Sequence, residues 1–256
     1  MEAVIRGATM QVLELTLRPG ESVVAEAGQL GWFDEGIELE TSTALAGADG
    51  VWDGAEHPLD GGTLFMARYR STTRPGTVVF PARLPGTIFQ IPLGPDRSYL
   101  IQRHGFLAGL EGVELSTALR PGHVGSAVSG ELGFVLQKLE GVGHAWIELG
   151  GEISEYGLAD GERLRVHPAH VGVIERGVAY ELTTVPEMEN KLFGGDGVFL
   201  VQLTGPGKVW LQSLSLPVLA HALQPYLPKP GVGPTPAQGL EATGVTAAVK
   251  GTAELL

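Results

Sequence analysis

The chain contains no cysteine and has few basic residues for its length. Its 256 residues include 17 lysines and arginines against 29 aspartates and glutamates, which gives a formal net charge of −12. Without cysteine there can be no disulfide, no thiolate metal site and no cysteine nucleophile. The acidic excess opposes nonspecific binding to nucleic acid and to anionic lipid, because bulk electrostatic repulsion does not depend on sequence. We therefore expect no nucleic acid among the partners.

Long apolar runs are also missing. No stretch of about 18 consecutive apolar residues occurs, so the sequence predicts no membrane-spanning helix. The segment from Met1 to Arg6 has no apolar core flanked by basic residues, as a signal sequence would have. These two absences predict a cytoplasmic protein.

Glycine and proline, in contrast, are abundant. The chain has 38 glycines and 17 prolines, and they separate apolar runs instead of clustering in one low-complexity block. That distribution is typical of tight turns between strands. Hydrophobic residues make up 43% of the chain, which is enough for a sizeable core. The composition predicts an all-β domain with little helix.

The clearest unit is the stretch from Gly194 to Leu216. Val198 to Leu203 is a run of mostly β-branched, aromatic and aliphatic residues. Lys208 to Leu214 resumes the strand pattern, with Val209, Leu211 and Ser213 on one side and Trp210, Gln212 and Leu214 on the other. The sequence Gly-Pro-Gly at 205–207 separates these runs and cannot continue a strand. Two such runs around a short glycine turn predict a β-hairpin.

Two weaker copies of this unit lie upstream, at residues 133–148 and 65–80. A tryptophan follows the turn at the same offset in the two later copies, and a valine takes its place in the first. The residues that we expect to be equivalent are Val79, Trp146 and Trp210.

A second turn alternates with the first along the chain. It reads Glu-Gly-Ile-Glu-Leu at 35–39, Glu-Gly-Val-Glu-Leu at 111–115 and Arg-Gly-Val-Ala-Tyr at 176–180. One glycine per turn then recurs at steps of 40, 36, 31, 34 and 30 residues, through Gly36, Gly76, Gly112, Gly143, Gly177 and Gly207. Self-similarity at a regular period indicates units that must stack to bury their apolar faces. We predict three tandem hairpin-rich repeats, about 1–90, 91–155 and 156–216, packed with pseudo-threefold symmetry.

The remaining segments differ from the repeats. Residues 44–60 are polar and rich in glycine, which predicts a loop inserted in the first repeat. Residues 217–224 place apolar side chains on one helical face and have proline in the first turn, so we expect one short helix there. The tail at 229–256 contains much glycine and proline and no aromatic residue, and we expect it to be mobile or held by a neighbouring subunit. The predicted organisation is thus one β domain at 1–228, which includes the helix, and a tail.

Several of these segments resemble the altered-inheritance-of-mitochondria protein 24 family. The resemblance rests on Leu-Thr-Gly-Pro-Gly-Lys-Val-Trp at 203–210, on 133–139 and on 111–115, and it extends over about residues 1–228. It implies a fold similar to that of the tryptophan RNA-binding attenuation protein, a variant of the double-stranded β-helix that often forms homo-oligomers. Bacterial members mostly have no assigned activity, and mitochondrial members look like organising factors of the inner membrane. The resemblance implies no catalytic residue.

Motifs that would indicate chemistry are scarce. His167 and His170 are the densest pair of candidate metal ligands, but proline at 168 predicts a turn, and no carboxylate follows at a fixed spacing. The His-x-His-x-x-x-x-Glu pattern of cupin metal sites is absent. The lysine after Gly-Pro-Gly at 205–207 is followed by a strand pattern, whereas a phosphate loop leads into a helix. We therefore predict no metal site, no cofactor and no catalytic residue.

These observations favour a non-enzymatic, homo-oligomeric scaffold or interaction protein, with a trimer or a ring as its assembly. The alternative is a β-helix protein or enzyme that binds a small ligand or a metal, which would require polar groups to converge in a cavity. A third hypothesis, RNA binding by analogy of fold, is opposed by the acidic composition.

The sequence also suggests where a partner would bind. Equivalent turns of stacked repeats gather at one end of the body, and the apolar residues before those turns are Trp32, Phe33, Leu110 and Ile174. These side chains could instead point inward, as buried residues near strand ends commonly do. Trp32 and Phe33 are adjacent, however, and adjacent residues of a strand face opposite sides. We expect one of the two to lie on a contact with another subunit, a protein partner or a membrane surface.

Overall fold

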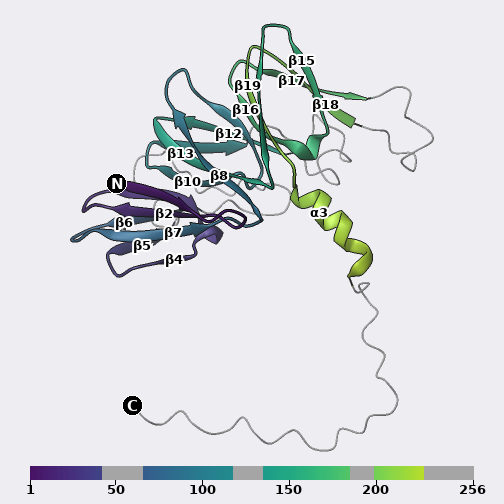
Figure 1. The fold of residues 1–256 in the computed structure, drawn as a ribbon. Helices are drawn as coiled ribbons and strands as arrows, with labels where there is room; N and C mark the ends of the chain where they lie inside the picture. Colours follow the sequence, from purple (N-terminus) through teal and green to yellow (C-terminus); the bar gives the residue numbers. More distant parts are fainter. Residues whose placement is uncertain (42–65, 118–134, 185–198, 228–256) are drawn as a thin grey trace, which may run out of the picture. The chain divides into compact units, whose positions relative to one another are not determined.

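The computed structural model of the chain describes residues 1–41, 66–117, 135–184 and 199–227 (Figure 1). Residues Met1–Ala220 form one compact unit, and His221–Leu256 form a second. Most regular elements among the described residues of the first unit are strands. In the described ranges these are β1 (Glu2–Arg6), β2 (Val12–Leu17), β3 (Ser22–Glu26), β4 (Trp32–Phe33), β5 (Ile37–Thr41), β6 (Met66–Ser71), β7 (Gly76–Pro81), β8 (Gly86–Leu93), β9 (Tyr99–Gln102), β10 (Phe106–Leu110), β11 (Val113–Thr117), β12 (Leu136–Gly141), β13 (Gly143–Gly150), β14 (Ile153–Leu158), β15 (Arg163–Val166), β16 (Val171–Glu175), β17 (Ala179–Thr184), β18 (Phe199–Thr204) and β19 (Gly207–Gln212).

Antiparallel pairing joins these strands into four sheets. The first sheet has the order β1-β2-β7-β4, and the second has the order β5-β6-β3-β10-β13-β8. The third sheet is β11-β12-β9-β16-β19-β14, and the fourth is β15-β18-β17. The prediction of an all-β fold with one short C-terminal helix is confirmed. The pseudo-threefold arrangement and the β-helix stay predictions.

The same strand pairings recur along the chain. β2 pairs with β7, β8 with β13, and β14 with β19. β7, β13 and β19 each have a second partner on the opposite edge. These second partners are β4 for β7, β10 for β13, and β16 for β19. The remaining strands also pair alike, as β5-β6-β3, β11-β12-β9 and β17-β18-β15.

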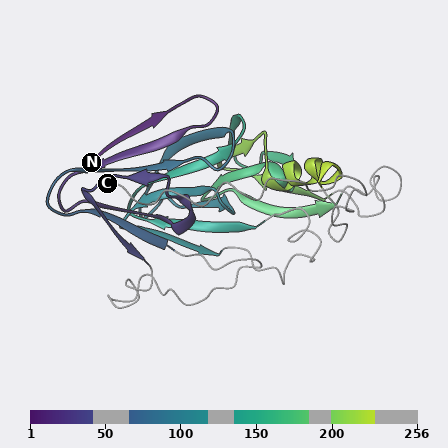
Figure 2. The ribbon, with the colours of Figure 1, turned by 90° about the horizontal axis from the view of Figure 1, so that it is seen from below.

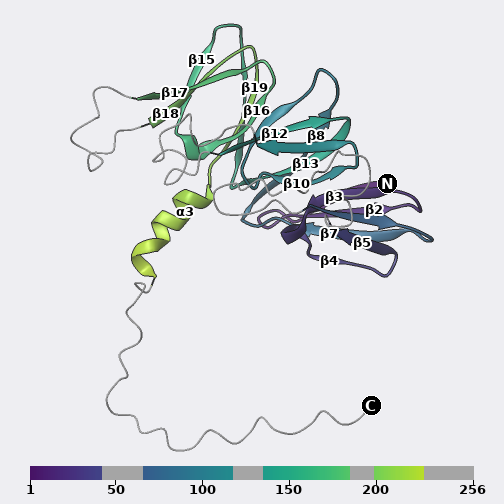
Figure 3. The ribbon, with the colours of Figure 1, turned by 180° about the vertical axis from the view of Figure 1, so that it is seen from behind.

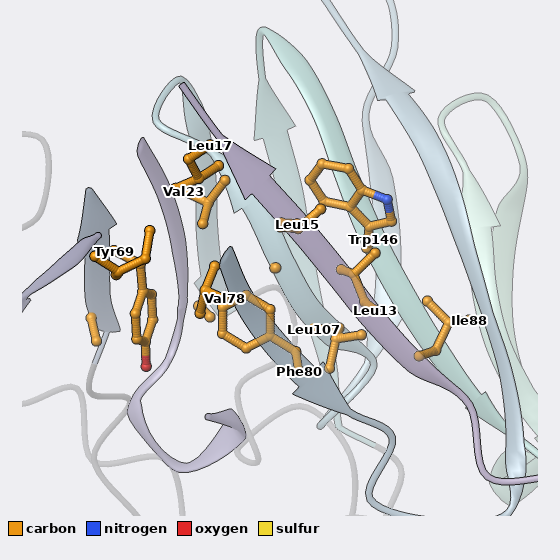
Figure 4. Close-up of a cluster of buried hydrophobic side chains, with 14 of the residues drawn as sticks. Leu13, Leu15, Leu17, Val23, Tyr69, Val78, Phe80, Ile88, Leu107 and Trp146 are labelled. Carbon is orange, nitrogen blue, oxygen red and sulfur yellow. The ribbon is translucent and has the colours of Figure 1, made fainter. Parts of the chain in front are cut away.

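One hydrophobic cluster lies between each two successive sheets. Leu13 and Phe80 of the first sheet pack with Trp146 of the second, as Figure 4 shows. A second cluster joins residues of the second and third sheets, and a third cluster joins residues of the third and fourth. Strands of the first and fourth sheets accordingly appear at opposite ends of the succession in Figure 2.

Alternation along the strands explains which faces are buried. In β2, Leu13, Leu15 and Leu17 are fully buried, and the residues between them are only partly covered. Successive side chains of a strand point to opposite faces, so every second residue enters the cluster between the first and second sheets. The polar and apolar pattern of the sequence therefore determines which face of β2 is buried.

The predicted hairpins are wrong, although the strands and turns that compose them are present. β18 and β19 flank the Gly-Pro-Gly turn at 205–207, yet β18 belongs to the fourth sheet and β19 to the third. The strands around the equivalent turns, β12 with β13 and β6 with β7, also lie in different sheets. The turn is a corner between sheets, at which Gly207 has a φ of 140°. Alternating runs around a glycine turn specify two strands and a change of direction, but they do not specify that the two strands pair with each other.

The helix α3 spans Leu216–Leu223, close to the predicted range 217–224. Ser215 begins it, because its hydroxyl accepts a hydrogen bond from the backbone N–H of Val218 and its carbonyl accepts one from Leu219. The other helical segments within the described residues are the short 3₁₀ turns η1 (Ala27–Gln29), η3 (Pro168–His170) and η5 (Gln224–Tyr226). Within the described residues no helix is long and apolar enough to cross a membrane. The cytoplasmic location stays a prediction.

For two of the predicted segments the structure gives no description. The inserted loop at 44–60 and the tail at 229–256 both lie outside the described residues.

Candidate functional site

The four residues predicted to form an interaction surface do not share one environment. Trp32 and Phe33, which make up β4, are 58% and 41% exposed. Leu110 is partly buried and packs against the first two hydrophobic clusters. Ile174 is 1% exposed and lies in the third cluster, so its assignment to a surface is wrong. Its strand β16 is paired on both edges, by β9 and by β19, and the side chain enters the core.

The position of β4 is determined by the residues on either side of it. Gly31 donates a backbone hydrogen bond to the Val79 carbonyl, and a Cβ at Gly31 would come within 2.7 Å of the Pro81 ring. Beyond the strand, the carboxylate of Asp34 accepts hydrogen bonds from the backbone N–H groups of Gly36 and Thr77. The exposed aromatic pair is therefore held on a defined backbone.

β4 differs from its counterparts in the neighbouring sheets. β10 and β16 each pair with two strands and are almost wholly buried. β4 pairs only with β7, and its second edge has no strand partner among the described residues. An open edge that carries two exposed aromatic side chains is a candidate interaction surface.

A second candidate site is a cavity of about 310 Å³ at the ends of β9, β13 and β19. The first residues of α3 cover part of it. Its polar lining residues are Arg83, Gln102, Arg103, His104, Glu148 and Gln212, and the covering residues of α3 are Leu216, Pro217 and Ala220.

Arg83 is the centre of the charged part of this cavity. Its guanidinium pairs with the carboxylate of Glu26 and lies 3.8 Å from the carboxylate of Glu148. The backbone N–H of Arg83 donates to Glu148 Oε2 at 2.8 Å, and the Gln29 amide donates to Glu148 Oε1 at 2.9 Å. Arg83 Nη1 is buried without a hydrogen-bond partner. Two nearly buried carboxylates are thus balanced by one guanidinium and one amide.

The environment of the cavity shifts the pKa values of Glu148 and His104, each in the direction that favours the neutral form. Burial raises the pKa of Glu148, although the hydrogen bonds from Arg83 and Gln29 and the charge of Arg83 act against that shift. Burial also lowers the pKa of His104, and the positive charge of Arg83 lowers it further. His104 has a φ of 68°, a conformation that few residues other than glycine adopt.

Two glutamines form the uncharged part of the cavity. The amides of Gln102 and Gln212 donate to each other's oxygens, at 2.8 and 2.5 Å. Gln212 also donates to the Ala169 carbonyl and accepts from the backbone N–H of Gly150. His170 Nδ1 lies 2.8 Å from the backbone carbonyl oxygen of Gln212. A carbonyl oxygen can only accept a hydrogen bond, so this nitrogen carries a proton. Because these polar groups are paired with one another, this part of the cavity stabilises the ends of β9 and β19.

The histidine pair that the sequence singled out lies on η3. The rings of His167 and His170 are 5.8 Å apart between centroids. Nδ1 of His167 accepts a hydrogen bond from the backbone N–H of Ala169, and burial lowers the pKa of His167. Each Nδ1 is thus engaged with the backbone. Among the described residues no group of three or more potential ligands could hold a metal ion.

Sequence reasoning missed the cluster of Arg83, Glu26 and Glu148. Its members are distant in the chain, and the one local signal is a charged residue at 148 between two buried aliphatic residues of β13. A carboxylate in such a run indicates a buried partner.

Comparisons with known proteins agree with this fold. The family model described as Mitochondrial biogenesis AIM24 matches residues 3–214. An uncharacterised protein of Streptococcus pyogenes serotype M6 is 26% identical over 227 residues, which is 87% of this chain and 89% of the relative. A crystal structure of a Streptococcus pyogenes protein superposes with a TM-score of 0.67 at 23% identity, and the match covers 88% of this chain and 99% of the other.

Proposed function

Because the chain belongs to the mitochondrial biogenesis AIM24 family, we propose that it is a homo-oligomeric scaffold or interaction protein and not an enzyme. The observation that carries this proposal is the open edge of β4, with Trp32 and Phe33 exposed on it. Proteins rarely leave a sheet edge and adjacent aromatic side chains uncovered, because the edge can pair with another chain.

We further propose that residues 1–216 consist of three units of one construction. The recurrence of the strand pairings supports this proposal, since each pairing found near the N-terminus reappears twice. The registers also correspond: the residues paired on either side are Glu14 and Trp32 for Val79, Gln90 and Ala108 for Trp146, and Glu155 and Val173 for Trp210. Repeated units provide repeated edges, which is what a scaffold requires.

The state of the cavity supports a structural role over a catalytic one. The guanidinium of Arg83 is paired with Glu26 and lies close to Glu148, and the two glutamines are paired with each other. A general acid or base must instead have a free atom within reach of a substrate. Most of the polar atoms here are already occupied by neighbouring side chains.

The test is the mass of the protein in solution. We expect multi-angle light scattering at micromolar concentration to give a multiple of the monomer mass. A Trp32→Ala, Phe33→Ala double variant should shift toward the monomer and keep its circular dichroism spectrum. Tyr156→Ala is the matched control, because Tyr156 is also an exposed aromatic residue, at 44%, and should leave the mass unchanged. A parent protein that is monomeric in this experiment would end the proposal.

One observation favours a second candidate function, the binding of a small anion. Arg83 Nη1 is buried without a partner beside a cavity of about 310 Å³, which is at the lower end of the range for ligand pockets. Acetate and succinate are suitable probes, because a guanidinium binds carboxylates. If either acid binds there, it should raise the melting temperature of the parent and not that of Arg83→Lys. Equal shifts in both proteins would exclude this site.

A further inference from the structure

The first and fourth sheets each contain only part of what the second and third contain. The second sheet consists of two groups of three strands, β5-β6-β3 and β10-β13-β8, joined by the pair β3 with β10. The third consists of β11-β12-β9 and β16-β19-β14, joined by the pair β9 with β16. The fourth sheet, β17-β18-β15, matches the first group, and β4-β7-β2 of the first sheet matches the second group. The two strands that lack a joining partner are therefore β15 and β4.

The two existing junctions have the same register. In the second sheet Ala108, Gly109 and Leu110 lie opposite Ala25, Val24 and Val23, and in the third sheet Val173, Ile174 and Glu175 lie opposite Ile101, Leu100 and Tyr99. The residues of β16 follow their counterparts on β10 by 65 positions, and the residues of β9 follow their counterparts on β3 by 76 positions. Subtracting 76 from the β10 positions gives the corresponding residues of β4, and adding 65 to the β9 positions gives those of β15. These steps place Trp32 opposite Val166, Phe33 opposite Arg165 and Asp34 opposite Leu164.

We propose that β4 of one copy of this chain pairs with β15 of a second copy in this register. The first sheet of one copy and the fourth sheet of the other then form one continuous antiparallel sheet, β17-β18-β15-β4-β7-β2-β1, built like the second and third. This inference rests on the proposed function, since it names the partner of the β4 surface as another copy of the same chain.

Exposure supports the pairing. Trp32 and Phe33 are 58% and 41% exposed, whereas Val173 and Ile174 at the corresponding positions of β16 are at most 1% exposed. β15 shows the same contrast, because two of its four residues are exposed and the matching strand β3 is mostly buried. β4 and β15, which lack the joining partner that β10, β16, β3 and β9 have, are therefore more exposed than those counterparts.

Charge supports it as well. β15 has Arg163 and Arg165 on its exposed face, and β4 leads directly into Asp34 and Glu35. At the second-sheet junction the residue that corresponds to Glu35 is Glu111, whose carboxylate lies 2.9 Å from Arg68 Nε of the neighbouring segment. Arg68 lies on β6, one strand beyond the junction strand β3. In the proposed register Glu35 lies opposite Arg163, so a carboxylate and a guanidinium meet at this junction.

The two edges belong to different copies because one chain keeps them apart. The second and third sheets lie between the first and the fourth, with a hydrophobic cluster at each contact. Figures 1 and 3, which view the molecule from opposite sides, both show β4 and β15 at opposite ends of the succession of sheets. Each copy then offers one edge of each kind, a head-to-tail contact that propagates until a ring closes.

Cysteine cross-linking tests the pairing directly, because the chain has no cysteine of its own. Phe33→Cys and Arg165→Cys are made in separate chains, mixed and oxidised. Residues directly opposite in antiparallel strands have Cα atoms about 4.5–5.5 Å apart, within the span of a disulfide. We expect a disulfide-linked dimer on a non-reducing gel. Arg163→Cys is the matched control for Arg165→Cys: it lies two residues out of register, more than about 7 Å away, and should cross-link at least about five-fold less.

A photochemical variant keeps an aromatic side chain at position 33. p-Benzoylphenylalanine in place of Phe33 should, on irradiation, attach to a peptide that contains Arg163–Val166 of a second copy, as identified by mass spectrometry. Attachment to another part of the chain would overturn the proposal.

The outcomes separate this inference from the proposed function. An oligomer by light scattering in which Phe33→Cys and Arg165→Cys chains form no disulfide with each other would leave the scaffold standing and refute the β4 with β15 junction. A chain that has both substitutions and closes its disulfide at monomer mass would show pairing within one chain and would also refute it. A monomeric mass without any cross-link ends both proposals.

Discussion

The backbone amide of Arg83 donates a 2.8 Å hydrogen bond to the carboxylate of Glu148, and the guanidinium of the same arginine pairs with Glu26. One residue in the loop after β7 thereby connects the first sheet to the ends of β3 and β13 in the second. The stability of the protein and its dependence on pH should both reflect these contacts.

Replacing Arg83 with alanine should destabilise the protein by about 3 kcal/mol, because it leaves two nearly buried carboxylates without their cation. Chemical denaturation at pH 7 measures this change. Arg74→Ala is the control, since Arg74 pairs with Glu35 on the surface, where the side chains are 58% and 93% exposed. Equal losses in the two variants would show that the Arg83 cluster contributes no more than a surface ion pair.

The stability difference between the parent and Glu148→Gln should depend on pH. Burial raises the pKa of Glu148, so the folded state binds this proton more readily than the unfolded state does. The favourable contribution of the carboxylic acid is fully present below its ordinary pKa of 4.5 and is lost as the pH rises through the higher folded value. Denaturation curves from pH 4 to 8 should therefore show that the free energy of unfolding of the parent rises relative to that of Glu148→Gln as the pH falls. A constant difference would contradict the raised pKa.

His104 should act in the opposite direction. Burial and the charge of Arg83 lower its pKa, so the unfolded state binds the proton more readily. The parent should lose stability as the pH falls below the ordinary value of 6.5, and His104→Asn should lose less over the same interval. Asparagine suits the φ of 68° at this position. His144→Asn, which replaces an exposed imidazole on β13, controls for the loss of a histidine elsewhere. Parallel pH profiles for the parent and His104→Asn would refute the assignment.

Two tryptophans should separate folding from association. Trp146 is 1% exposed at the centre of the first hydrophobic cluster, and Trp146→Ala should cost about 4 kcal/mol because it opens a cavity there. Trp32→Ala should change the unfolding of an isolated subunit little, since that side chain is 58% exposed. Its effect should appear in the oligomer mass. A large loss of subunit stability for Trp32→Ala would mean that β4 contributes mainly to the fold.

Local patterns predicted the elements that depend on local interactions. Alternation identified strands such as β2 and β19, because the side-chain period of a strand is two whatever its partner is. The helix after Ser215 was predicted to within one residue at each end, since a capping residue and an early proline act within a single turn.

Partner choice could not be obtained in the same way. β18 and β19 look like a hairpin in the sequence and belong to different sheets, because a turn between two alternating runs is compatible with either arrangement. Ile174 was placed on a surface for the same reason: the strand β9, which covers it, lies more than seventy residues earlier in the chain.

By itself, then, the sequence determined the all-β class, the positions of the turns, the short C-terminal helix and the family, all of which follow from period, glycine placement and local motifs. Only the tertiary structure decided which strands pair, that the Arg83, Glu26 and Glu148 side chains meet, and that β4 and β15 lack the joining partner that their counterparts in the second and third sheets have. The physical reason is that pairing and burial depend on contacts between residues distant in the chain, and one sequence has no local signal that specifies them.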